Sequence, residues 1–298
     1  MKQIVVALSR NPLNQKELIQ AFKVFAKHNP DLRLTVFGTE KQLNILKGNE
    51  EVDIAPASAE EVMKKACGKA AIEPESALIV LGSRKDLLAE SAAHLQPKAG
   101  RHPVLGVFIP TRVYNRSVFF LDLGANLQPD DAYLKECLED ALFYEEKIVS
   151  SKKNRYTLLY PGKPAEGTVS FHFDENAKTD PAYAGTIDPG EILEGKSEIV
   201  LGESPLIVSA LEGAKGSIAA IYETGRDEIS KSAFFKFGLW WLKDVQKTIT
   251  NRFDRKLYGN GLILFGYPFP IIGLEESTTF GGISKALETA KRWLYAKQ

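Results

Sequence analysis

The sequence predicts an α/β fold, a three-layer arrangement in which a mostly parallel, twisted sheet carries helices on both faces. Three observations lead to this prediction. Short apolar runs alternate with helical patterns from the first residues onward. The runs are apolar at nearly every position, which is typical of strands buried on both faces. The chain has 298 residues, enough to bury a large core. We therefore expect a single α/β domain over residues 1–298.

The spacing of apolar residues predicts the individual elements. Strands are expected at residues 4–8, 32–38, 77–82, 104–110, 118–121, 156–162 and 197–204, with one or two more within 261–273. Helices are expected at residues 16–27, 60–69, 86–95, 129–147, 206–222 and 282–297. The strands at 104–110 and 118–121 are close enough in sequence to be either neighbours or a hairpin.

Two segments depart from the alternation. Residues 162–195 are rich in Gly, Pro, Asp and Glu and have weak periodicity, so we expect an irregular lobe there. Residues 228–257 are expected to form a projecting helical region of one or two helices. The apolar side chains between Ala233 and Leu242 go nearly all round such a helix, so a single core-facing stripe cannot bury them.

Cations flank these apolar residues, and three interpretations remain open for the segment. It forms a dimer interface, it docks onto an anionic membrane or an acidic partner protein, or it is an ordinary core helix. The residues of the predicted membrane or partner surface are Lys236, Phe237, Trp240, Trp241 and Lys243.

Composition narrows the classes of function. The 38 Lys and Arg residues balance 38 Asp and Glu residues, so no global charge favours nucleic acid. No apolar run approaches the roughly 20 residues that span a bilayer, and the N-terminus lacks the pattern of a signal peptide. Cys67 and Cys137 fall at helix positions far apart, as expected of buried thiols in a reducing compartment. We expect a cytoplasmic protein.

The sequence motifs do not predict a metal site or a nucleotide-binding site. The four histidines show no metal-like spacing with one another or with the cysteines. His172 is expected on a half-exposed strand. No stretch matches a phosphate-binding loop or a dinucleotide fingerprint. We therefore expect neither a metal nor a cofactor.

The turn after residues 118–121 is the most informative stretch. Gly124 marks the end of the strand, and Asp122 and Asn126 stand between it and a helix that Pro129 helps to start. Ligands of open α/β sheets bind where strands end and helices begin. We expect this turn to border a site, although Asx residues also bond to the backbone in turns with no further role.

Several motifs in this order resemble the bacterial phosphate acyltransferases of phospholipid synthesis, the PlsX family. Asp122-Leu123-Gly124-Ala125-Asn126, followed by Pro129, is similar to that family's Asp-Val-Gly-Ala-Asn turn. Supporting matches along the chain are Asp31-Leu32 through Gly38, His102-Pro103-Val104-Leu105 with Pro110-Thr111, Leu211-Glu212-Gly213, Tyr258-Gly259 with Leu264-Phe265-Gly266, and Pro270-Ile271-Ile272.

The resemblance implies an isocitrate/isopropylmalate dehydrogenase-like fold and a homodimer. It implies transfer of a fatty acyl group from acyl carrier protein, or from acyl-CoA, to inorganic phosphate, which gives acyl phosphate. Contact with the inner face of the membrane is implied as well.

Four loops depart from the family pattern, at residues 8–12, 82–86, 203–205 and 275–279. They keep a second interpretation open, a non-catalytic paralogue that binds acyl chains, carrier protein or membrane.

The expected site residues follow from these turns. Candidate catalytic residues are Asp122, Asn126 and Ser204. Candidate phosphate-binding residues are Arg10, Asn11, Arg84, Lys85, Gly124 and Glu203. The cations among them would hold an anion, and the alternative is that they are solvated loop charges. We expect the basic turns and the Asp122 turn to share one cavity.

Overall fold

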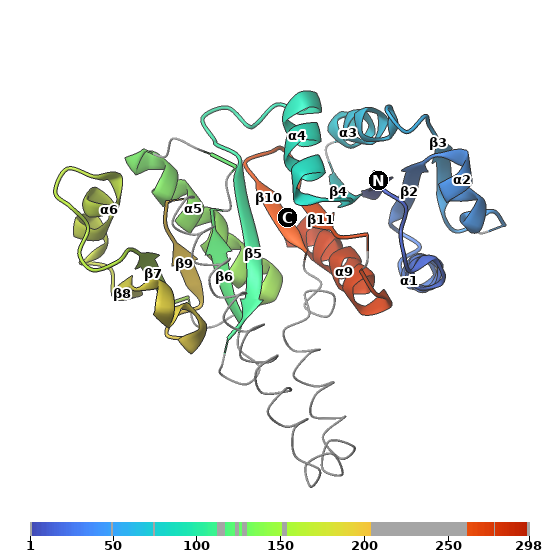
Figure 1. Ribbon diagram of the computed structural model, residues 1–298. Coiled ribbons are helices and arrows are strands. Elements are labelled where there is room, and N and C mark those ends of the chain that lie inside the picture. Colours follow the sequence, from blue (N-terminus) through green and yellow to red (C-terminus); the bar gives the residue numbers. More distant parts are fainter. Residues whose placement is uncertain are drawn as a thin grey trace, which may run out of the picture.

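The computed structural model describes residues 2–48, 50–73, 75–111, 117–122, 125–126, 130–150, 154–203, 261–276 and 278–296. These residues form one 11-stranded sheet with helices on both faces (Figure 1). The predicted α/β fold with a large, mostly parallel sheet is confirmed.

The boundaries of the elements lie close to those expected from the apolar spacing. The strands are β1 (Gln3–Leu8), β2 (Arg33–Gly38), β3 (Asp53–Pro56), β4 (Ser76–Leu81), β5 (Val104–Pro110), β6 (Ser117–Leu121), β7 (Tyr156–Leu159), β8 (Tyr183–Ile187), β9 (Ile199–Leu201), β10 (Leu262–Phe265) and β11 (Ile271–Leu274). The helices are α1 (Gln15–His28), α2 (Glu40–Leu43), α3 (Val62–Ile72), α4 (Arg84–His94), α5 (Asp131–Phe143), α6 (Val169–Ala177) and α9 (Phe280–Ala296). Shorter helical turns are η1 (Asn44–Leu46), η2 (Tyr144–Val149) and η3 (Pro189–Glu194).

The strands fall into two parallel groups that run in opposite directions. Their order across the sheet is β3-β2-β1-β4-β11-β10-β5-β6-β9-β7-β8. The first five of these strands are parallel, and β5 runs the same way because it pairs antiparallel to β10, which is itself antiparallel to β11. β6 pairs antiparallel to β5, and β9, β7 and β8 follow the direction of β6.

Because of this reversal, strands end at both of the two edges of the sheet that run across the strand ends. We call the edge at which β1 and β4 end the Arg10 edge, and the edge at which β6 and β9 end the Asp122 edge. The carboxyl ends of the two strand groups therefore lie on opposite sides of the sheet.

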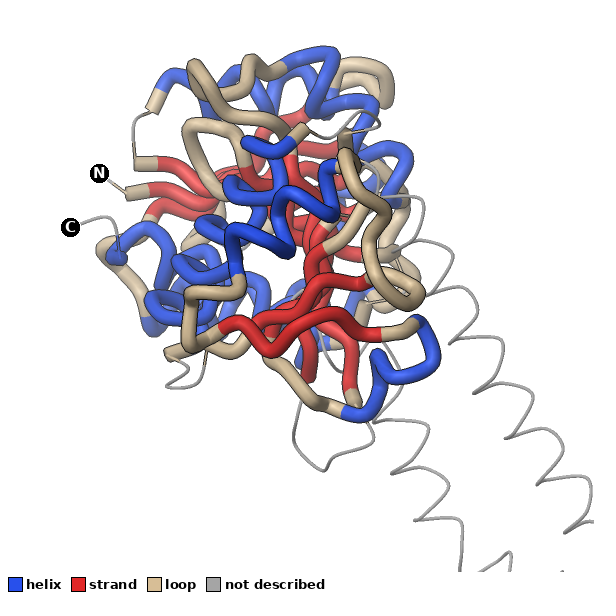
Figure 2. Tube along the Cα trace, turned by 90° about the vertical axis from the view of Figure 1, so that its left-hand side faces the viewer, coloured by secondary structure: helices blue, strands red, loops and turns tan. Residues whose placement is uncertain are grey.

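Each face of the sheet has its own core, and the sheet lies between two layers of helices (Figure 2). On one face, side chains of α1, α5 and α9, among them Phe22, Leu134 and Trp293, pack against the strands. On the other face, α3 and α4 contribute Cys67 and Leu87. Both cysteines are buried free thiols, as predicted. Within the described part of the chain, no helix is long and apolar enough to cross a membrane.

Residues 162–195 are more regular than expected. They contain α6, β8 and η3, because Thr168 and Asp188 cap the two helical segments and Phe173, Ile187 and Ile192 are buried. His172 lies exposed on α6 and not on a strand. The expected helices at 206–222 and 228–257 lie outside the described residues.

Candidate functional site

The Asp122 carboxylate holds the turn after β6 together. Its Oδ1 atom accepts the backbone N–H of Leu105 at 3.2 Å and that of Ala125 at 3.1 Å, and Oδ2 accepts the backbone N–H of Asn126 at 3.2 Å. The side chain is fully buried. Burial raises the pKa of Asp122, and the hydrogen bonds that favour its charged form oppose this shift.

The Asp122 carboxylate, which has no access to solvent, thus accepts hydrogen bonds from three backbone N–H groups. This arrangement assigns Asp122 to shaping the turn and tying it to the start of β5.

Helix α5 begins beside the turn and covers the same corner. Asp130 caps the helix, since its Oδ1 accepts the backbone N–H of Tyr133 at 2.8 Å. The Tyr133 side chain is buried, and burial, with the nearby Cys137 and Asp122, raises the pKa of its hydroxyl. Its ring packs edge to face against His102 with centroids 5.7 Å apart. The polar turn is therefore walled off by an aromatic side chain.

Glu203 approaches the same edge from the neighbouring strand. β6 and β9 pair in parallel, with Leu121 opposite Leu201, so Asp122 and Glu203 follow adjacent strand ends. The Oε1 atom of Glu203 accepts the hydroxyl of Ser170 on α6 at 2.8 Å. The structure therefore brings Asp122, Asn126 and Glu203 to one edge.

Arg101 and His102, which also lie at this edge, were not among the predicted site residues. Arg101 and His102 precede β5, and the Arg101 guanidinium pairs with Glu139 at 2.7 Å and Asp140 at 2.6 Å. The backbone N–H and Nδ1 of His102 lie 3.0 and 3.2 Å from Oε2 of Glu136. The His102-Pro103 motif was the signal available in the sequence, where it served only as part of a family resemblance.

Asp140 is the acid of this cluster whose protonation is most perturbed. Burial raises its pKa to about 6, although Arg101 opposes the shift. Its Oδ2 atom is buried and makes no hydrogen bond within the described part of the chain. Asp140 is therefore poised to titrate near neutral pH.

Arg10 lies on the opposite edge and is neutralised there. Its Nε and Nη2 atoms contact the two carboxylate oxygens of Asp86 at 2.6 and 3.3 Å, and this bond lowers the pKa of Asp86. Asp86 also forms a reciprocal cap with Ser83, each side chain accepting the other residue's backbone N–H at 3.1 Å. The Asp86 carboxylate thus pairs with Arg10 and caps the start of α4 at the same time.

Arg84 and Lys85 open α4 at the same corner, but their side chains lie outside the described residues. Asn11 is exposed next to Arg10. Gly124 and Ser204 lie outside the described residues, as do the five residues of the predicted membrane or partner surface, Lys236, Phe237, Trp240, Trp241 and Lys243. Their roles stay predictions.

The expectation of one shared cavity is wrong. β1 and β6 are five positions apart in the sheet, which is about 24 Å at the usual strand spacing. Because β6 runs opposite to β1, the carboxyl ends that Asp122 and Arg10 follow also lie at opposite edges of the sheet. The hairpin between β5 and β6 causes the reversal, and the apolar pattern of the two strands did not reveal it.

No group of three or more His, Cys, Asp or Glu side chains that could hold a metal ion occurs among the described residues. The groups that the structure describes at the Asp122 edge are backbone amides, the Asn126 side chain, the Asp122 and Glu203 carboxylates and the charged cluster around Arg101.

The fold defines the class of protein. A branched-chain phosphotransacylase from Enterococcus faecalis V583 superposes with a TM-score of 0.55 at 15% identity, covering 99% of each chain. A phosphotransacetylase from Streptococcus pyogenes gives a TM-score of 0.56 at 12% identity, covering 99% of this chain and 94% of the other. The protein thus has the fold of the phosphotransacylases.

Comparison of the amino-acid sequence with known proteins identifies a particular set of homologues. The chain is 25% identical to the phosphate acyltransferase of Mycoplasmopsis pulmonis over 100% of this chain and 97% of that protein. It is 23% identical to the phosphate acyltransferase of Thermoanaerobacter pseudethanolicus over 94% and 90% of the two chains. No protein-family model matches the chain. The chain is therefore a divergent homologue of the phosphate acyltransferases, and the resemblance seen in the sequence is confirmed.

Proposed function

We propose that the protein is an acyl-transfer enzyme that moves a fatty acyl group from the thioester of acyl carrier protein to inorganic phosphate. A phosphate oxygen bonds to the thioester carbonyl carbon, the C–S bond breaks, and the thiol leaves with a proton. The products are acyl phosphate and free carrier thiol. Phosphate is itself the nucleophile, so the protein has to position the substrates and stabilise charge.

The observation that carries this proposal is the turn built around Asp122. It stands where strand ends meet the start of α5, a position that favours anions because the first helical N–H groups and the helix dipole carry positive charge. We assign Asn126 to donating a hydrogen bond to the carbonyl oxygen as it gains charge. We assign Glu203 to passing a proton from the attacking phosphate to the sulfur of the leaving thiol. Asp122 is assigned to positioning the turn.

The residues of the Arg10 edge take no part in this site. The Asp86 carboxylate already contacts Arg10 through both oxygens and balances its charge, and Arg10 lies on the edge opposite the Asp122 turn. Ser204 and Gly124, next to Glu203 and Asp122 in sequence, belong to the proposed site by position.

The direct test is phosphate-dependent formation of acyl phosphate, trapped as the hydroxamate with hydroxylamine. Purified protein is mixed with palmitoyl carrier protein, or with palmitoyl-CoA, and phosphate. We expect hydroxamate and free thiol in equal amounts, both absent when phosphate is omitted. Thiol release that does not depend on phosphate would identify a thioesterase and refute the proposal.

A second function is favoured by the ion pair at the Arg10 edge. A homologue in which a basic turn is closed by its own Asp86 has lost an anion-binding corner, as a non-catalytic paralogue would. Such a protein would bind acyl chains, carrier protein or membrane without turnover. Lipid retained through purification, or liposome binding lost on substituting Trp240 and Trp241 by alanine, together with no hydroxamate, would favour it.

The proposal extends to the assembly and its surroundings. On the resemblance of the sequence to the phosphate acyltransferases, we also propose an isocitrate/isopropylmalate dehydrogenase-like variant of the fold and a homodimer. On the same ground we propose a cytoplasmic protein that reaches the inner face of the membrane through a surface containing Phe237 and Trp240. Sedimentation equilibrium tests the dimer, and flotation with anionic vesicles tests the membrane contact.

A further inference from the structure

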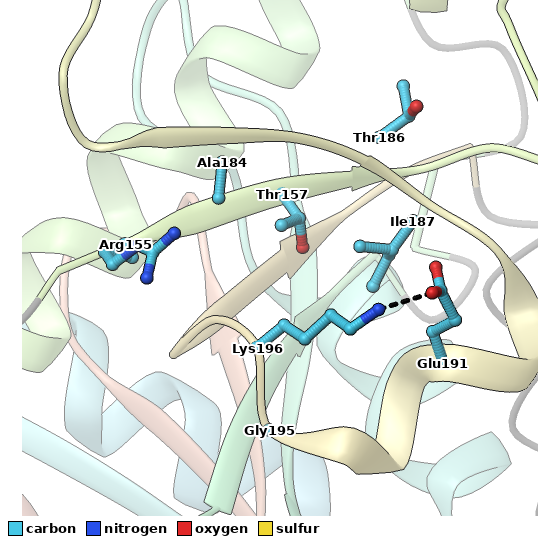
Figure 3. Close-up of a pocket in the computed structure, with 8 residues that line it drawn as sticks. All are labelled: Arg155, Thr157, Ala184, Thr186, Ile187, Glu191, Gly195 and Lys196. Carbon is cyan, nitrogen blue, oxygen red and sulfur yellow. Dashed lines mark hydrogen bonds and ion pairs between the residues drawn. The ribbon is translucent and has the colours of Figure 1, made fainter.

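A hollow of about 500 Å³ lies beside the edge strand β8 (Figure 3). Its lining includes Arg155 just before β7, Thr157 on β7, Ile187 on β8, and Glu191 and Lys196 from η3 and the turn that follows. Its volume lies within the range of small-molecule sites. None of these residues has a role in the proposed acyl transfer.

The wall formed by η3 is well anchored. Asp188 and Glu191 form a reciprocal cap, in which the Asp188 backbone N–H donates to Oε2 of Glu191 at 3.2 Å. Ile192 is buried in the core, and Gly195 ends the segment with a φ of 70°. The hollow is therefore bounded by ordered backbone on both sides.

Hydrogen bonds hold the backbone of Arg155, while its guanidinium is exposed. Its N–H donates to Oε2 of Glu198 at 3.2 Å, and its carbonyl accepts the N–H groups of Glu198 and Ile199 at 3.0 and 3.1 Å. The guanidinium is exposed and makes no ion pair with the described residues. Figure 3 shows it on the wall opposite the Lys196–Glu191 pair.

The other charged side chains at the hollow are engaged in ion pairs. The Lys196 ammonium contacts the Glu191 carboxylate, and it lies 3.2 Å from Glu194. The Thr157 hydroxyl shares a hydrogen bond of 2.8 Å with the Ser197 hydroxyl. One wall thus offers a guanidinium that makes no ion pair among the described residues, and the other offers groups that can exchange hydrogen bonds with a neutral ligand.

We propose that this hollow binds a small phosphate monoester that carries hydroxyl groups at its other end. Arg155 holds the phosphate, because the guanidinium fork matches two oxyanion oxygens at once. The Lys196–Glu191 pair receives the hydroxyl groups. This site stands or falls independently of the acyl transfer proposed above.

Isothermal titration of the full chain with ribose 5-phosphate tests the proposal, with ribose, inorganic phosphate and gluconate as comparison probes. Ribose 5-phosphate should bind with a Kd of about 1 mM or tighter. Inorganic phosphate and ribose should bind at least about tenfold more weakly, since each engages one wall. No heat from ribose 5-phosphate at about 10 mM, or equally tight binding of gluconate, would overturn the assignment.

Substitutions locate the binding. Arg155→Ala should weaken ribose 5-phosphate about tenfold or more, and Arg155→Lys should recover only part of the loss. The matched control is Lys163→Ala, which removes an exposed cation near the hollow but outside its lining. Because the Arg155 head makes no ion pair with the described residues, the variant should keep the wild-type unfolding midpoint. Unchanged affinity in Arg155→Ala would contradict the proposal.

Discussion

The Asp122 carboxylate accepts the backbone N–H of Leu105 at 3.2 Å, and this bond joins the end of β6 to the start of β5. The same carboxylate also binds Ala125 and Asn126, so one buried side chain positions the whole turn. Leu105 is a β5 residue, and β5 is preceded by the Arg101 and His102 cluster. The Asp122 carboxylate therefore connects the turn to the strand that follows the charged corner.

Removing the Asp122 carboxylate should destabilise the protein strongly. Asp122→Ala leaves three backbone donors without their acceptor, and we expect a loss of about 3 kcal/mol or more. Asp122→Asn should lose less, since one oxygen remains, although its amide faces the Asn126 N–H. Urea unfolding midpoints measure both. The control is Asp130→Asn, which keeps a good helix cap and should change the midpoint little. Similar midpoints for Asp122→Ala and Asp130→Asn would contradict this role.

Gly106 allows Phe119 to pack across β5. A Cβ atom at Gly106 would lie 2.6 Å from Cζ of Phe119 and 3.3 Å from the carbonyl oxygen of Phe120. Gly106→Ala should therefore cost about 1–3 kcal/mol, because Phe119 must leave its stacking contact with Phe108.

The matched control for Gly106 is Gly68 on α3, where a Cβ atom would meet nothing within 4 Å. Gly68→Ala should stabilise the protein by up to about 1 kcal/mol. Thermal unfolding compares the two variants. A neutral Gly106→Ala would show that β5 and β6 pack less tightly than described.

Asp140 should make stability depend on pH. Its pKa rises from the ordinary 3.8 to about 6 on folding, so the folded state binds more protons between about pH 4 and 6. The protonated form contributes stability below pH 4, and this contribution is lost as pH rises through 6. The shift corresponds to about 3 kcal/mol at most.

Asp140→Asn removes this titration while Arg101 keeps Glu139 as a partner. The free energy of unfolding of this variant, relative to the wild type, should rise between pH 4 and 7. Urea titrations at four pH values measure the difference. A difference that stays constant with pH would show that Asp140 titrates in its usual range.

The two cysteines should be unreactive in the folded protein. Burial raises the pKa of Cys67 to about 12 and that of Cys137 well above its ordinary value. A disulfide reagent at pH 8 should therefore label neither thiol in buffer and both in 8 M urea, to be read by mass spectrometry of the intact chain. Rapid labelling in buffer would indicate that the α3 or α5 face opens readily.

The sequence predicted most strands because they are buried on both faces and apolar throughout, as residues 4–8 illustrate. β3 was missed because two of its four residues are exposed and none is fully buried. The expected irregular lobe proved to contain α6 and β8, whose few buried residues, such as Phe173 and Ile187, are too widely spaced to show a period.

The candidate site was predicted only in part for a different reason. Strand positions can be read from apolar runs, but the direction in which each strand crosses the sheet cannot. Asp122 and Arg10 both follow buried strands, and parallel strands would have placed both at one edge. The antiparallel pairing of β5 with β6 separates them. The parallel pairing of β6 with β9 brings Glu203 to the Asp122 edge instead.

The most direct test of the account is the phosphate-dependent hydroxamate assay on two variants that keep the wild-type unfolding midpoint. Asn126→Ala removes the proposed donor to the charged oxygen and should lower kcat/KM about a hundredfold. Arg10→Ala breaks only an exposed ion pair on the opposite edge and should stay within about twofold of the wild type. Loss of activity in Arg10→Ala with full activity in Asn126→Ala would place the chemistry at the wrong edge and contradict the account.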